Sequence, residues 1–256
     1  MKTVNKEELE AKVKDMYRLV AEQPNGKYHF ELGRQLAEQL GYSPADLNKV
    51  PQGAMESFAG VGYHFDLCDI KAGERVLDLG SGSGMDVFVA ALHASEHGAV
   101  TGVDMTDEQL TKAKRLAESS NFKNTSFEKS YIEKLPFADG SFDAVISNGV
   151  INLSADKEAV FKEISRVMKH GGRMAISDIV TEKPLTEGIT CDADLWASCI
   201  GGAMQEDEYK KLIEAAGMKI VSFRDNPQYV FISSSAQNAS KKFGVKSVSL
   251  LATREK

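Results

Sequence analysis

The sequence predicts an α/β fold with a doubly wound, mostly parallel sheet, and three observations support this prediction. From Lys71 onward, short β-branched runs alternate with longer segments of helical periodicity, which is the pattern of βαβ units. A glycine-rich turn follows the first of these runs directly. The 256 residues are enough for one sizeable core with an appended cap, but hardly for two independent domains.

The residues before this alternation are predicted to form helices. An apolar stripe at helical spacing from Leu9 to Val20 indicates the first helix. The stretch "FELGRQLAEQLG" indicates a second helix that stops at Gly41. Ser43 as N-cap and Pro44 at the first helical position then indicate the start of a third.

The alternating part predicts strands at "RVLDL", "AVTGVD", "TSFEKS", "FDAVISN" and "RMAISDI", with helices between them. The helix in "DKEAVFKEISRVMKHGG" is expected to end at Gly171–Gly172, where glycine and positive charge suit a helix C-terminus. A last helix, "DEYKKLIEAAG", precedes strands "KIVSFRD" and "VKSVSLLAT", whereas "NPQYVFISSSAQNASKKFG" shows no clear pattern. We therefore expect three parts: a helical cap at 1–55, the core at 56–180, and a substrate-side insertion with final helix and strands at 181–256.

Composition excludes several classes of partner. The net charge is −6 without a lysine- and arginine-dense face, so we expect neither nucleic acid nor membrane as partner. No apolar run approaches the roughly 18 residues of a membrane span, and the charged N-terminus does not resemble a signal peptide. Cys68, Cys191 and Cys199 are too few for a disulfide framework, which favours free thiols and a cytoplasmic location. The five histidines show no metal-ligand spacing, so no metal is expected.

The turn in "RVLDLGSGSGMD" indicates a ligand site, because ligands of doubly wound sheets bind beyond the carboxyl ends of the strands. Gly80, Gly82 and Gly84 would let the backbone approach a ligand where a β-carbon would collide. A dinucleotide fingerprint, G-x-G-x-x-G, would need its third glycine at Met85 or Val87. Neither register fits, which counts against a dinucleotide-dependent oxidoreductase, the second hypothesis.

Two acids indicate a different cofactor. Asp78 stands directly before the turn, where it would repel a pyrophosphate but attract an ammonium group by roughly 1–4 kcal/mol at about 4 Å. Asp104 closes the next strand, twenty residues after the last glycine, and suits two ribose hydroxyls. S-adenosylmethionine combines an amino-acid head with a ribose and carries no phosphate.

With these motifs the sequence resembles the seven-strand methyltransferases that use S-adenosylmethionine, over at least Lys71–Ile179. The resemblance implies a Rossmann-like, seven-stranded sheet with an N-terminal helical cap. It implies that Met105 packs on the adenine, that Tyr131 and Ile132 border its edge, and that Asn148 faces the methyl donor. The full set of expected cofactor-binding residues is Asp78, Gly80, Ser81, Gly82, Gly84, Asp86, Asp104, Met105, Tyr131, Ile132, Glu133 and Asn148.

Within that superfamily the chain is most similar to the arsenite methyltransferases, from about Gly60 to Gly217, and "VINL" and "CIGGA" are the specific phrases. This resemblance implies that cysteine thiolates hold trivalent arsenic while its lone pair displaces the methyl group directly, without a general base and with S-adenosylhomocysteine as product. Only Cys199 matches a family ligand. Gly149 and Val61 stand where the family has cysteines.

The departures leave the acceptor open. The substrate is expected to be arsenite or a thiol conjugate of it, and the alternative is another small molecule with an S, N, O or C acceptor. His64, Tyr63 or His170 would then be candidates for a base, and Trp196 would either line the pocket or belong to the core. A third hypothesis is a methyltransferase fold that binds its cofactor without catalysis. The sequence does not predict an oligomeric state.

Overall fold

The computed structural model describes residues 5–192, 195–196 and 200–255. Its strands are β1 (Arg75–Leu79), β2 (Ala99–Asp104), β3 (Thr125–Lys129), β4 (Phe142–Asn148), β5 (Met168–Thr181), β6 (Met204–Gln205), β7 (Met218–Asp225) and β8 (Lys246–Arg254). Its helices are α1 (Lys6–Glu22), α2 (Gly33–Leu40), α3 (Pro44–Leu47), α4 (Gln52–Glu56), α5 (Phe65–Cys68), α6 (Met85–Ala94), α7 (Asp107–Ser119), the 3₁₀ turn η1 (Ile151–Leu153), α8 (Lys157–Val167), α9 (Glu187–Thr190), α11 (Glu206–Ala215) and α12 (Ser234–Phe243).

The strands form one sheet in the order β3-β2-β1-β4-β5-β8-β7, and β6 pairs with the end of β5. The pairs from β3 to β5 are parallel, whereas β8 runs antiparallel to β5 and β7. The predicted doubly wound, mostly parallel sheet is therefore confirmed. The two-residue β6 adds an eighth strand to the seven that the resemblance implied.

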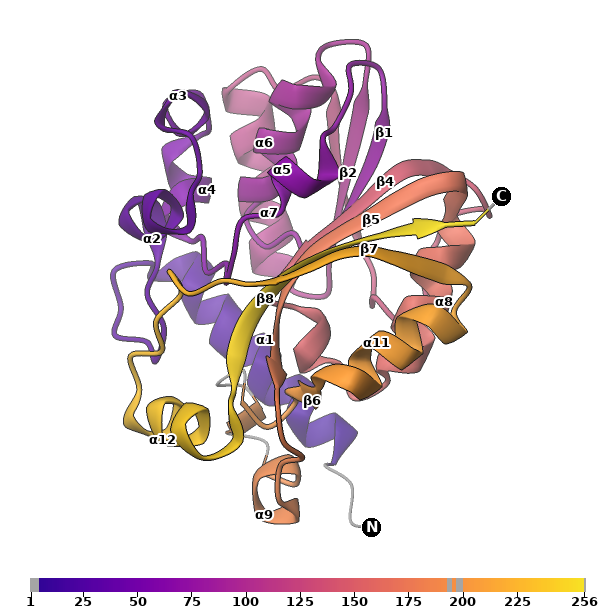
Figure 1. Cartoon of the computed structure of the whole chain (residues 1–256). Helices are drawn as coiled ribbons and strands as arrows, with labels where there is room; N and C mark the ends of the chain where they lie inside the picture. Colours follow the sequence, from indigo (N-terminus) through magenta and orange to yellow (C-terminus); the bar gives the residue numbers. More distant parts are fainter. Residues whose placement is uncertain (1–4, 193–194, 197–199, 256) are drawn as a thin grey trace.

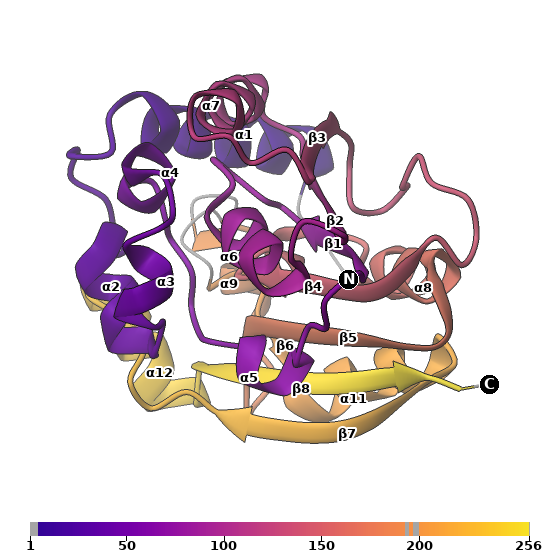
Figure 2. The ribbon, with the colours of Figure 1, turned by 90° about the horizontal axis from the view of Figure 1, so that it is seen from above.

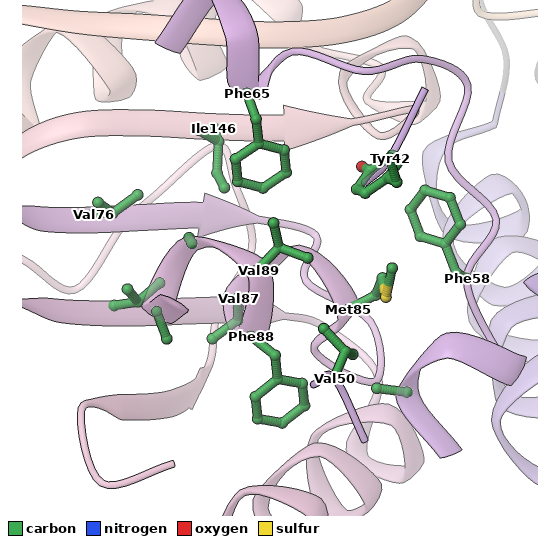
Figure 3. Close-up of a cluster of buried hydrophobic side chains, with 14 of the residues drawn as sticks. Tyr42, Val50, Phe58, Phe65, Val76, Met85, Val87, Phe88, Val89 and Ile146 are labelled. Carbon is green, nitrogen blue, oxygen red and sulfur yellow. The ribbon is translucent and has the colours of Figure 1, made fainter. Parts of the chain in front are cut away.

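Helices cover both faces of this sheet, with α6 and α7 on one side and α8 and α11 on the other (Figure 1). Successive residues of a strand point to opposite faces, so Val76 and Ile146 join the core beneath α6, near Phe88 (Figure 3). Their neighbours Leu77 and Val145 join the core beneath α8. Burial on both faces explains why these strands read as continuous apolar runs.

The predicted end of α2 and the predicted start of α3 are confirmed, whereas α2 begins at Gly33, later than the stretch from Phe30 suggests, and α4 was not predicted. Gly41 ends α2 in the left-handed conformation, with φ 108°. The Ser43 hydroxyl accepts a hydrogen bond from the backbone N–H of Ala45, and Pro44 opens α3. Figure 2 shows α2, α3 and α4 grouped at one end of the molecule, next to α6 and α7. The first helix, α1, packs along α7.

The helix α8 ends earlier than the sequence analysis predicts: its last residue is Val167, and Gly171–Gly172 belong to β5. Met168 is fully buried and has an extended backbone, so its packing in the apolar core ends the helix and starts the strand at that residue. The pairing of β5 with β4 skips the residues between Met168 and Arg173, which form a bulge. The two glycines therefore lie in this bulge and do not end a helix.

The stretch without a clear sequence pattern contains α12. Its N-cap is Ser233, whose hydroxyl accepts a hydrogen bond from the N–H of Ala236, and Gly244 ends it with φ 67°. Among the described residues, no helix has both the length and the apolar character that crossing a membrane requires.

The chain order of the strands creates a crevice beside β1. After β3 the chain returns to the other side of β1 and continues as β4. The loops that follow β1 and β4 therefore leave the sheet in different directions at neighbouring positions. In doubly wound sheets this switch point is where ligands bind.

We predict that Gly84→Ala costs about 1–3 kcal/mol more unfolding free energy than Gly73→Ala, the range for overpacking a core. Both glycines have positive φ, 93° and 86°, so both substitutions strain the backbone. A β-carbon at Gly84 would lie 2.9 Å from the ring of Phe127, whereas one at Gly73 would meet nothing within 4 Å. Urea unfolding measures the difference, and equal losses would refute the packing role.

Candidate active site

A cavity of about 620 Å³ opens at the carboxyl ends of β1, β2 and β4. Of the residues that the sequence predicts to bind the cofactor, those that line it are Asp78, Gly80, Ser81, Gly82, Asp86, Asp104, Met105, Tyr131, Ile132, Glu133 and Asn148. Only Gly84 of the predicted set is absent from the lining. The fold thus brings together side chains from four separate loops of the sequence.

A different structural reason explains why each of the three positions in the turn is a glycine. A β-carbon at Gly80 would lie 2.4 Å from a methyl of Val150, so this glycine admits the loop that follows β4. Gly84 packs against Phe127 as described above. At Gly82 a β-carbon would meet only the Gln109 amide, at 3.7 Å, and the position faces open space. Only Gly82 thus has the room beside its backbone that close approach of a ligand requires.

Asp78 is a buried carboxylate that faces this cavity without a compensating donor. It is 2% exposed, and among the described residues no donor hydrogen-bonds to it. Burial, followed by the nearby Asp86 and Asp104 carboxylates, raises the pKa of Asp78 well above its usual value. A cation bound in the cavity would relieve this cost. The residues present therefore fit a ligand with a positive charge.

Asp104 is held in place by backbone donors. One carboxylate oxygen accepts from the N–H of Gly82 at 2.9 Å, and the other accepts from the N–H of Thr106 at 2.8 Å. Burial raises the pKa of Asp104, and these hydrogen bonds oppose that rise. Each carboxylate oxygen accepts more than one hydrogen bond, so capacity remains for hydroxyl groups of a ligand.

Asn148, at the end of β4, joins the cavity to the loop before α5. Its amide nitrogen donates to Asp86 at 3.1 Å and to the Tyr42 hydroxyl at 3.0 Å. Its amide oxygen accepts from the N–H groups of Val61 at 2.8 Å and Gly62 at 3.3 Å. Tyr42 donates to Asp86 at 2.6 Å. Asn148 thus positions the neighbouring loop as well as lining the cavity.

Sequence reasoning missed Tyr42 in this network. It follows a helix-ending glycine, where an aromatic residue is ordinarily a packing residue, and Figure 3 shows it packed near Phe58. Its hydroxyl is what distinguishes its role, because that group fixes the Asp86 carboxylate. Burial raises the pKa of Asp86 to about 6, although the hydrogen bonds from Tyr42 and Asn148 lower it.

The helix α1 forms a wall of the cavity that the sequence analysis did not assign. Leu9, Glu10, Val13 and Tyr17 contribute to the lining. Polar contacts hold this helix in place: the Tyr131 hydroxyl donates to Glu10, and the Gln109 amide donates to the carbonyl of Tyr17 at 2.8 Å. No sequence motif marks such contacts, since they join residues about a hundred positions apart.

The acceptor side is only partly described. Cys199 lies outside the described residues. Val61 and Gly149 are neighbours, since a β-carbon at Gly149 would lie 3.1 Å from a methyl of Val61. Cys68 is fully buried, and burial raises the pKa of its thiol to about 12. Neither Cys68 nor Cys191 lines the cavity.

The structure does not bring the candidate bases to the cavity. His64, Tyr63 and His170 are all absent from its lining. His64 is fully buried, and burial lowers its pKa to about 3. His170 is exposed and contacts the carbonyl of Glu255. The sequence analysis left open whether Trp196 lines the pocket or belongs to the core. In the structure it is a buried core residue outside the lining.

Comparisons with known proteins agree with this geometry. A family model described as a methyltransferase domain matches residues 70–217. The chain is 40% identical over 185 residues to the arsenite methyltransferase of Halobacterium salinarum, covering 72% of this chain and 47% of that protein. It is 43% identical over 152 residues to the arsenite methyltransferase of Aquipseudomonas alcaligenes, covering 57% and 44%. The chain thus spans less than half the length of these curated relatives.

A solved structure gives the same picture in three dimensions. The crystal structure of CrArsM, an arsenic(III) S-adenosylmethionine methyltransferase from Chlamydomonas reinhardtii, matches with a TM-score of 0.66 and 30% identity. The match covers 88% of this chain and 75% of that one. The match to the family model over residues 70–217 defines the class, a methyltransferase domain. The chain belongs to the methyltransferase domain family, with arsenite methyltransferases among its relatives.

We predict that Asp78→Asn stabilises the ligand-free protein at neutral pH by about 0.5–2 kcal/mol, the range for single stabilising substitutions. The folded-state pKa of Asp78 is raised, so the native state binds more protons than the unfolded state, and stability falls as pH rises toward the folded pKa. The amide removes this loss. Thermal unfolding at about pH 5 and pH 8 measures it, with the exposed Asp207→Asn as control. A lower melting temperature for Asp78→Asn at about pH 8 would contradict the prediction.

Proposed function

We propose that this cavity binds S-adenosylmethionine and that the chain transfers its methyl group to trivalent arsenic held as a thiolate by Cys199. The buried Asp78 carboxylate, which faces the cavity without a donor among the described residues, is the observation that carries the cofactor. The sequence similarity to arsenite methyltransferases supports the acceptor. The cytoplasmic location and the division at residues 55 and 180 stay predictions.

The roles of the cofactor residues follow from their chemistry. Asp78 would hold the ammonium group of the cofactor. Asp104 would accept hydrogen bonds from the ribose hydroxyls, through the carboxylate lone pairs that the N–H groups of Gly82 and Thr106 do not use. Met105 and Ile132 supply apolar surface for the adenine. Glu133 lines the same part of the cavity.

When bound, the cofactor supplies a methyl group on a positively charged sulfur. The chain's part is to orient and to exclude water: Val13 of α1 and Leu153 beyond β4 provide apolar walls. A trivalent arsenic atom already has a free lone pair, so no base is needed. The absence of His64, Tyr63 and His170 from the lining agrees with such a reaction.

The two missing family cysteines define how the acceptor would be held. Val61 and Gly149 stand side by side, so two thiolates of the family's arrangement are replaced by one apolar patch. Soft arsenic prefers sulfur ligands. With Cys199 as a single protein thiolate, the remaining sulfur ligands would come from a thiol such as glutathione. We therefore favour a thiol conjugate of arsenite over free arsenite.

A second candidate function is methyl transfer to another small molecule, and the apolar part of the cavity favours it. Phe58, Val150 and Leu153 line the cavity and would suit a carbon-rich acceptor. His64, Tyr63 and His170 do not line the cavity, so an acceptor that must lose a proton would rely on a lining carboxylate such as Glu10 or Glu133.

We predict that S-adenosylhomocysteine binds and that Asp104→Ala weakens its binding by roughly 1–3 kcal/mol, the cost of lost hydrogen bonds to a charged group. Calorimetric titration measures the affinity, and circular dichroism checks that the variant remains folded. NADH serves as the matched control ligand and should not bind. Binding of NADH instead of S-adenosylhomocysteine would support the dinucleotide-dependent alternative.

For the acceptor, arsenite with glutathione and labelled cofactor should give methylated arsenic. We predict that Cys199→Ser lowers the rate at least about a hundredfold, because a hydroxyl is a poor ligand for soft arsenic. Cys191→Ser is the matched control and should retain activity. Equal activity of Cys199→Ser and wild type would exclude thiolate capture by Cys199. No turnover by wild type would favour the other acceptors, or a fold without catalysis.

A further inference from the structure

Lys157 occupies an unfavourable position for a positive charge. It is 6% exposed, and it begins α8 directly after the N-cap Asp156, where the helix dipole is itself positive. Lysine is almost never fully buried unless its charge is paired. The contacts around the ammonium group must therefore offset the free-energy cost of burying the charge and of placing it at the positive end of the helix dipole. These contacts also identify the segments that Lys157 connects.

The ammonium group contacts two different segments. Its Nζ donates to the backbone carbonyls of Asn152 at 3.1 Å and Ser154 at 2.8 Å, in the turn that follows β4. It also lies 4.9 Å from the ring centroid of Trp196. An ammonium group has three N–H donors, and a position over a tryptophan ring is favourable for a cation. Lys157 thus bridges the turn and the segment that contains Trp196.

Charged groups face Lys157 from two other elements. Asp178 of β5 and Glu133 of the loop after β3 both raise its pKa, but burial lowers it more, to about 8. Asp178 accepts a hydrogen bond from Tyr209 of α11 at 2.6 Å, and burial raises the pKa of Asp178 to about 6. Lys157 is therefore largely charged at neutral pH and loses its proton just above it.

The Trp196 segment is packed directly on the turn. The indole N–H of Trp196 donates to the carbonyl of Thr190 at 2.8 Å. A β-carbon at Gly202 would lie 1.8 Å from the carbonyl oxygen of Asn152, and one at Gly201 would lie 2.2 Å from the indole ring. Gly202 of "CIGGA" is thus required for the close approach to the turn, and Gly201 leaves room for the indole ring.

The opposite side of the turn belongs to the cofactor cavity. Leu153 and Ser154 line the cavity. The Ser154 hydroxyl donates to Glu133, which lines it as well. Lys157 itself is outside the lining. A ligand that contacts Leu153, Ser154 or Glu133 therefore acts on the same turn that Lys157 holds from behind.

We propose that Lys157 is a positioning residue that couples the cofactor cavity to Trp196. Its ammonium group ties the Ile151–Ser154 turn to Trp196, so that occupation of the cavity changes the placement of Trp196, which precedes Cys199 by three residues in the sequence. The catalytic meaning of this coupling rests on the proposed function, because Cys199 is there the acceptor's ligand. The coupling itself does not, since Trp196 reports on it directly.

Tryptophan fluorescence tests the coupling, because Trp196 is the only tryptophan in the chain. In wild type we expect the emission to change when S-adenosylhomocysteine binds, and to titrate with a midpoint near the Lys157 pKa of about 8. Lys157→Met keeps much of the side-chain volume but removes the charge. In this variant both responses should disappear, while calorimetry shows that S-adenosylhomocysteine still binds. The KM of the acceptor should rise about fivefold or more, the scale of coupling between sites.

Lys162→Met is the matched control, because Lys162 lies on the same helix, is exposed, and forms an ion pair with Glu158 on the helix surface. It should keep both fluorescence responses. Persistence of both responses in Lys157→Met would overturn the proposal. Should that variant fail to fold, the wild-type titration decides: an emission that stays constant between about pH 6.5 and pH 9.5 contradicts it. If wild type does not bind S-adenosylhomocysteine, the proposed function fails, and the pH titration still decides whether Lys157 acts on Trp196, the contact on which the coupling depends.

Discussion

The site depends on a carboxyl group, that of Asp78, which the protein buries without a hydrogen-bond donor or a cation among the described residues. Asp78 is the last residue but one of β1, beside the switch point of the sheet, and the acids nearest to it, Asp86 and Asp104, add repulsion instead of relief. Asp86 and Asp104 each receive hydrogen bonds from the protein, whereas none of the described donors reaches Asp78. The ligand-free site is thus electrostatically incomplete. A cofactor with a positive charge is the group that completes it.

The acceptor side follows a different principle. Asn148 and the Gly80–Val150 contact fix the loops around the cavity by close packing and hydrogen bonds. Val61 and Gly149, where the sequence analysis expects the family cysteines, are buried neighbours outside the cavity lining. Among the described residues, the cavity therefore has carboxylates for the proposed cofactor but no thiol for the acceptor.

The sequence predicted what local chemistry determines. Asp78 and the glycine turn lie at the end of β1, and Asp104 lies at the end of β2. Because these two strands are parallel neighbours, the three features come together in one cavity. The predicted end of α8 was wrong, because burial of Met168 ends the helix before the lysine and the glycines that indicated a helix C-terminus. Tyr42 and Lys157 could not be predicted, since their roles come from hydrogen bonds and a ring contact made only after folding.

Proton release on cofactor binding tests the central claim most directly. Titration of S-adenosylhomocysteine at about pH 6, in buffers of different ionisation enthalpy, measures the protons exchanged. Because the pKa of Asp78 is raised in the ligand-free protein, a bound ammonium group should lower it and expel a proton, and Asp78→Asn should abolish that release. Tight binding with no proton released, or with release unchanged in Asp78→Asn, would show that Asp78 is not the partner of the positive charge.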